Sequence, residues 1–182
     1  MNFLQLALAG RCFIGSTAAA GVAIPLTTAT AQVFGIYNPP GSAVDIVLNK
    51  LSLGIATLGT NIVAAINWSF LSNVQSVATG QPITAFTNTT VQNARLGNGY
   101  ASKARFTGSA ATTVAATHLM SLGMTSTTGT PTNSNAVMVF DHNASLIVAQ
   151  GTAVFLVGSV APGSTYQASL SWAEVPVAQI VV

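Results

Sequence analysis

The sequence predicts an all-β protein built as an antiparallel β-sandwich, with a jelly roll as the expected topology. Apolar side chains recur at every second residue, Gly- and Pro-rich turns separate the runs, and Val, Ile and Thr dominate the runs themselves. A two-residue period is that of a strand with one buried face, and many short strands with such turns are typical of sandwiches. We expect the sandwich over residues 31–176, an extended N-terminal arm over 1–30 and a C-terminal tail over 177–182.

The first expected strand, 31–37, ends at a turn with the sequence Asn-Pro-Pro-Gly-Ser at 38–42. Proline lacks a backbone donor and glycine accepts a positive φ, so this pentapeptide stops a strand. The next strand, 43–56, changes its apolar phase between Leu48 and Leu51. Such a change of face predicts a β-bulge or a bend at that point.

The middle of the chain is less regular. Residues 62–70 alternate large apolar with small or polar side chains, whereas 72–135 carries clusters of Thr, Asn and Gly at 86–99 and 125–135. Within it, the apolar residues of 110–124 recur near helical spacing, which favours a short helix against the many threonines there.

The last forty residues are expected to form an antiparallel meander. Its strands are predicted at 136–140, 145–149, 153–160 and 165–175, and the first turn is a hairpin at Asp141-His142-Asn143. The last strand alternates most cleanly, with an apolar face that ends at Trp172. The expected core anchors are Trp68, Trp172, Phe34, Phe140 and Phe155.

Charged residues are scarce: five Lys or Arg and three Asp or Glu among 182, which is 4% where about 25% is usual. This argues against charge-driven disorder, a nucleic-acid partner and an enzyme with several acids and bases, and we expect no cofactor. Neutral hydroxyls and amides can be buried beside a partner if they are hydrogen-bonded, whereas an unpaired ion is far more costly to bury. The composition therefore indicates that much of the outer surface contacts other protein.

The candidate chemical groups are few. Asp141 beside His142 is half of a hydrolytic arrangement, but neighbours on a tight turn seldom face each other, and a structural turn is favoured. A calcium site of carbonyl groups with Asp141 is the alternative. For His118 we expect a core or interface position, and for Cys12, with no histidine near it in sequence, a small buried hydrophobe.

The remaining patterns point to no metal, nucleic-acid or membrane site. No zinc-ligand spacing occurs, and Arg95, Lys103 and Arg105 form the only local cation cluster, suited to an anionic group of a neighbour or to a solvated turn. Arg11 interrupts the first apolar stretch where a signal peptide would be continuous. No run of about 18 apolar residues occurs, so neither export nor membrane insertion is expected.

Two segments carry a resemblance to a known family. VFGIYNPPGSAVDIVLNKLSLG, and SLIVAQGTAVFLVGSV with YQASLSWAEVPV a hundred residues later, resemble β-sandwich virion proteins of tailed bacteriophages, above all capsid decoration (cement or head-stabilisation) proteins. The likeness covers roughly 30–60 and 136–177. It rests on the turn from Asn38 to Ser42 and on the closing strand with Trp172, Glu174 and Pro176.

This resemblance implies a structural virion protein that binds the outside of the head and carries no catalytic residues. Its partners would be the major capsid protein and further copies of itself, as a homotrimer or dimer, with assembly in the host cytoplasm. The alternative is a tail-fibre or receptor-binding module whose loops at 86–99 and 125–135 contact glycans; an enzyme on a jelly-roll scaffold is disfavoured. The apolar ends are expected to supply the subunit interface, through Phe3, Leu4, Leu6, Arg11, Phe13, Ile180 and Val181.

Overall fold

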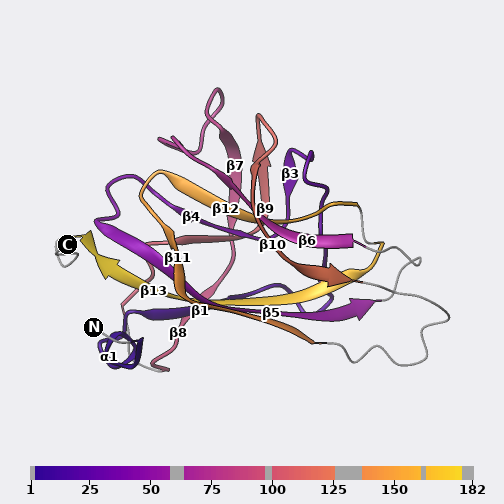
Figure 1. The fold of residues 1–182 in the computed structure, drawn as a ribbon. Helices are drawn as coiled ribbons and strands as arrows, with labels where there is room; N and C mark the ends of the chain where they lie inside the picture. Colours follow the sequence, from indigo (N-terminus) through magenta and orange to yellow (C-terminus); the bar gives the residue numbers. More distant parts are fainter. Residues whose placement is uncertain (1–2, 58–63, 97–99, 126–136, 161–162, 178–182) are drawn as a thin grey trace.

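The computed structural model confirms the all-β prediction: two antiparallel sheets, A and B, pack against each other (Figure 1). It describes residues 3–57, 64–96, 100–125, 137–160 and 163–177. The elements in chain order are α1 (Phe3–Leu8), β1 (Cys12–Ser16), β2 (Val22–Ala23), β3 (Ala31–Gln32), β4 (Gly35–Asn38), β5 (Val44–Thr57), β6 (Ala64–Leu71), β7 (Ile83–Asn88), β8 (Val91–Asn93), β9 (Arg105–Thr112), β10 (Thr117–Thr125), β11 (Met138–Val148), β12 (Thr152–Gly158) and β13 (Thr165–Pro176).

Sheet A has the strand order β11-β5-β13-β1-β8, with β2 also paired to β13. Sheet B has the order β10-β6-β12-β4-β9, and β3 and β7 both pair with β9. The long strands β5 and β13 run side by side through the middle of sheet A (Figure 1). These two strands form the central part of sheet A.

Eight of these strands pair in a nested order. β1 pairs with β13, β4 with β12, β5 with β11 and β6 with β10, all antiparallel. The pairs alternate between the sheets, so the chain crosses from one sheet to the other between successive members. β7, β8 and β9 are inserted between β6 and β10; β8 extends sheet A beside β1, and β9 extends sheet B beside β4.

The core between the sheets contains a continuous chain of aromatic rings. Phe13 lies 6.0 Å from Trp172, which lies 5.7 Å from Phe106; Phe106 is 5.1 Å from Phe34, and Phe34 is 6.4 Å from Trp68, between ring centroids. Each such pair contributes about 0.5–1.5 kcal/mol beyond its buried area. Gly15 permits the approach of β1, because a Cβ there would lie 2.7 Å from the ring of Phe106.

A second apolar cluster covers the outer face of sheet B. Tyr37, Phe155 and Val157 project to this side and pack with Ile83 and Phe86 of β7. β12 is therefore buried on both faces, which explains why its apolar residues form a run instead of alternating. Of the expected anchors, Phe155 lies in this second cluster and Phe140 is half-buried against the first.

The phase change in the strand at 43–56 is confirmed as a β-bulge. Asn49 has no partner in the register of β5 with β13, where Lys50 faces Ser171 and Leu48 faces Trp172. β11 skips the same residue on the other side of β5. Leu48 and Leu51 consequently both point into the core.

Four expectations were wrong in detail. The segment 1–30 is not an arm outside the sandwich, because β1 lies inside sheet A, between β13 and β8. Residues 110–124 form the end of β9 and β10 instead of a helix, as their β-branched content favours. The hairpin at 141–143 is a bulge within the continuous strand β11. The final strands are not a meander, because β12 belongs to sheet B while β11 and β13 belong to sheet A.

Candidate functional site

The outer face of sheet A is a candidate interface in the described part of the chain. Strand register arranges its outward side chains in rows that cross the sheet. One row runs Gln92, Ile14, Ser171, Lys50 and Asp141, and the next runs Ser16, Ser169, Ser52 and Val139. These side chains belong to alternate residues of the strands, and the residues between them point into the core.

This face is nearly neutral. Its hydroxyls bond to one another or to amides: the Oγ atoms of Ser16 and Ser169 lie 3.1 Å apart, and Asn49 Nδ2 donates to Ser171 Oγ at 3.3 Å. In the two rows, Lys50 and Asp141 are the only ions and occupy facing positions on β5 and β11. A partner can cover such a surface with hydrogen bonds alone.

Aliphatic side chains stand out from the same face. Ile14 is 41% exposed, Val139 53% and Ile147 55%. They lie on β1 and β11, on opposite sides of β13 and β5. Apolar groups spread over a neutral hydroxyl surface are suited to contact with another protein.

α1 covers one end of this face (Figure 1). Leu6 is buried there against Cys12 and Ala173. Leu4 and Leu8, one helical turn apart, point away and are each 66% exposed. The helix therefore hides one stripe of apolar residues and offers another to solvent beside the sheet.

The predicted interface residues divide into three groups. Phe13 and Leu6 are buried within the chain, so their assignment to a subunit contact was wrong: Phe13 fills the aromatic core and Leu6 covers β1. Of the other described residues, Phe3 and Arg11 are partly buried and Leu4 is exposed. Ile180 and Val181, with the rest of the tail beyond Val177, lie outside the described residues.

A buried carboxylate organises the segment that precedes β9. Glu174 accepts hydrogen bonds from Ser102 Oγ at 2.6 Å, Lys103 N at 2.9 Å and Ala104 N at 3.0 Å. Its side chain is therefore occupied in fastening this segment to β13. The glutamate of the Trp-x-Glu-Val-Pro motif thus has a structural role in this fold.

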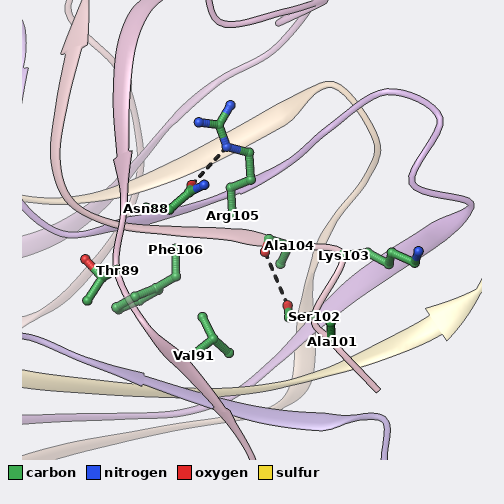
Figure 2. Close-up of a pocket in the computed structure, with 9 residues that line it drawn as sticks. All are labelled: Asn88, Thr89, Val91, Ala101, Ser102, Lys103, Ala104, Arg105 and Phe106. Carbon is green, nitrogen blue, oxygen red and sulfur yellow. Dashed lines mark hydrogen bonds between the residues drawn. The ribbon is translucent and has the colours of Figure 1, made fainter. Parts of the chain in front are cut away.

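A cavity of about 300 Å³ lies beside that segment, between the end of β7, β8 and the start of β9. Its lining combines Asn88, Thr89 and Ser102 with Val91 and Phe106. Figure 2 shows the guanidinium of Arg105 on the far side of β9 from Phe106, bonded to Asn88, and Lys103 pointing away. Lys103 and Arg105 both line the cavity, but their charged groups point in different directions.

Of the remaining candidate groups, Asp141, His142 and Cys12 have structural roles. Asp141 Oδ1 accepts a bond from Asn143 N at 3.0 Å, while His142 Nε2 accepts one from Trp68 Nε1, so the two side chains serve different partners. His118 is exposed on β10, so the core position expected for it is wrong, and a position at an interface stays a prediction. Burial raises the pKa of Cys12 to about 11, which makes this thiol a poor nucleophile.

Neither a metal cluster nor a membrane-spanning helix is found in the ranges that the structure describes. No three His, Cys, Asp or Glu side chains come together there as a metal would require, and no helix has the length and apolar character needed to cross a bilayer. Comparisons with protein-family models, curated proteins and solved structures find no match to this chain.

Proposed function

We propose that the protein is a structural virion subunit, a capsid decoration or cement protein that binds the outside of a phage head. The supporting observation is a surface of 8857 Å² with only eight charged residues in the chain, of which Glu174 is buried. Such a surface suits a component that is covered by its neighbours, since neutral groups are cheap to bury. The partners are the major capsid protein and further copies of this chain, as a homotrimer or dimer.

We infer further that the sandwich is a jelly roll. The nested pairs β1–β13, β4–β12, β5–β11 and β6–β10 are what a long hairpin rolled into two sheets produces, with β7–β9 as an insertion. Viral shell proteins are among the proteins built on this architecture. The fold alone does not define a function, so it supports the proposal only together with the neutral face of sheet A.

Binding to heads of the encoding phage that lack this protein tests the proposal. We expect the wild type to co-sediment with the particles in many copies. Ile14→Lys with Val139→Lys would lower the affinity about tenfold or more, since an unpaired charge would be covered. The matched control, Ala85→Lys with Ser109→Lys, adds the same charge at exposed positions of β7 and β9 and should bind as the wild type does.

Equal binding by both double variants would refute the assignment of this face. Failure of the wild type to bind would refute the decoration function itself. Melting curves of both variants distinguish a lost contact from a lost fold.

A second candidate function is favoured by one observation. The cavity beside Asn88 and Thr89 lies in the Thr- and Asn-rich stretch 86–99, and its mix of amide, hydroxyl and aromatic groups suits a sugar. A receptor- or glycan-binding module would show saturable binding on a glycan array that Thr89→Trp abolishes. Particle binding in many copies without any glycan signal would favour the decoration protein.

A further inference from the structure

A buried histidine is built into the edge of sheet A. The indole Nε1 of Trp68 donates a hydrogen bond of 3.2 Å to Nε2 of His142. Trp68 is fully buried and His142 is 5% exposed. Because Nε2 is the acceptor, the imidazole must be neutral with its proton on Nδ1.

His142 reaches this position only because β11 bulges. Four residues, 142–145, stand opposite the single residue Asn49 of β5. Asn143 and Ala144 have left-handed φ values of 47° and 60°, a conformation that costs energy for alanine. The bulge is held by Asp141 Oδ1, which accepts from Asn143 N, and by Ser145 Oγ, which donates to the carbonyl of His142.

Few charges surround this imidazole in the described elements. Asp141 is its neighbour on β11, β5 contributes Lys50 and Asp45, and β10 contributes only His118. β6 and β12 carry no ionisable side chain. Burial lowers the pKa of His142 from its ordinary value of 6.5, and the opposing effect of Asp141 is the smaller one.

We propose that Trp68 and His142 form an acid-sensitive latch that holds the bulge of β11 against the core. A proton on Nε2 would set an N–H⁺ against the indole N–H, two donors with no acceptor between them. The cationic ring must then leave the core and take residues 142–145 with it. This loosens one wall of a groove of about 230 Å³, lined by Phe70, Leu119, Leu146 and Ile147 among others.

The sign of the effect follows from linkage. The unfolded chain binds a proton at His142 near its ordinary pKa, whereas the folded chain binds it only at lower pH. Stability from this site is therefore complete above the ordinary pKa and is lost as the pH falls towards the lower, folded-state pKa. The latch is closed at neutral pH and opens in acid.

The chain carries two histidines, one buried and one exposed, so it supplies its own control. His142→Gln places Oε1 near the position of Nε2, which keeps an acceptor for Trp68 and removes the titration. We expect hydrogen exchange of the amides of residues 146–148, relative to intrinsic rates, to accelerate about tenfold or more between about pH 7 and about pH 5 in the wild type and in His118→Gln. In His142→Gln it should stay constant.

A measurement on the wild type alone covers the case in which the variant does not fold. The two indole N–H signals in a ¹⁵N spectrum belong to Trp68 and Trp172, and Trp172 Nε1 has no hydrogen-bond partner within the described residues. The Trp68 signal should shift with the titration of His142 while that of Trp172 stays in place. The same pH dependence in His142→Gln as in the wild type, or a Trp68 signal that ignores the titration, would overturn the latch.

Discussion

Single buried polar side chains hold distant parts of this fold together. Asn38 is fully buried, and its Nδ2 donates to the carbonyls of Val44 and Val148, each at 2.9 Å. Its Oδ1 accepts from Ser42 Oγ at 2.7 Å. One amide thus joins the end of β4 to the start of β5 and the end of β11.

Asn38→Asp tests this role without changing the shape of the side chain. The carboxylate cannot donate, so two buried carbonyls would lose their partner and face an acceptor. We expect the free energy of unfolding to fall by about 2–4 kcal/mol in a denaturant titration. Asn49→Asp, at a partly exposed position with one long bond, should cost less than about 1 kcal/mol; equal losses would contradict the assignment.

The turn at 38–42 was predictable, but the role of its first residue was not. Pro39, Pro40 and Gly41 announce a turn through their own backbone preferences. The burial of Asn38 depends on Val148, which is 110 residues away in sequence. No local pattern contains that information, and the same holds for Glu174 and the segment that it fastens.

At the scale of elements, bulges protect the sheet edges. β10 and β11 are the edge strands on one side of the sandwich, and both carry register shifts. On the other side, sheet A ends in the three-residue strand β8. Bulges and short edge strands prevent pairing with other chains, and here they replace the charged residues that the chain lacks.

Strands with one polar face were predictable, and the others were not. β5 and β13 alternate clearly, and the phase change at Asn49 could be located from the sequence. The apolar run of β12 indicates that both faces of the strand are buried, but it does not indicate to which sheet the strand belongs. The prediction therefore placed β12 in the wrong sheet. β1 was missed because five residues after a helical turn carry too short a pattern to separate a strand from an arm.

α1 should act as a cover for Cys12. In the native protein, burial and a pKa of about 11 leave about one thiol in a thousand ionised at about pH 8, and disulfide reagents should react only on unfolding. Deletion of residues 2–9 removes Leu6 and Phe3 from the thiol and should accelerate the reaction about tenfold or more while the sandwich stays folded. Leu4→Ser with Leu8→Ser, which alters only the outward stripe, should leave the rate unchanged.

An unchanged rate after the deletion would show that the sheet alone shields the thiol. Deletion of residues 2–28 has a different expected result. It removes β1 and with it Phe13, the first ring of the aromatic chain. That variant should not fold.

For the whole molecule, composition predicted an outer surface in contact with other protein, but it did not indicate the face that we propose for this contact. The scarcity of charge is visible in the sequence, whereas the neutral rows across sheet A exist only once five strands are in register. The apolar N-terminal residues were predicted to form the interface, but Phe13 and Leu6 are buried within the chain. The serines at alternate positions of β13 were the sequence signal for the neutral outer face of sheet A.

Sedimentation velocity of the purified chain, from micromolar to millimolar concentration, tests most directly whether this surface is made to be covered by protein. We predict a mass above the 18.4 kDa of one chain, as a dimer or trimer whose population grows with concentration and falls in the variant Ile14→Lys with Val139→Lys. A single species of 18.4 kDa that remains soluble and monodisperse at millimolar concentration would contradict the account.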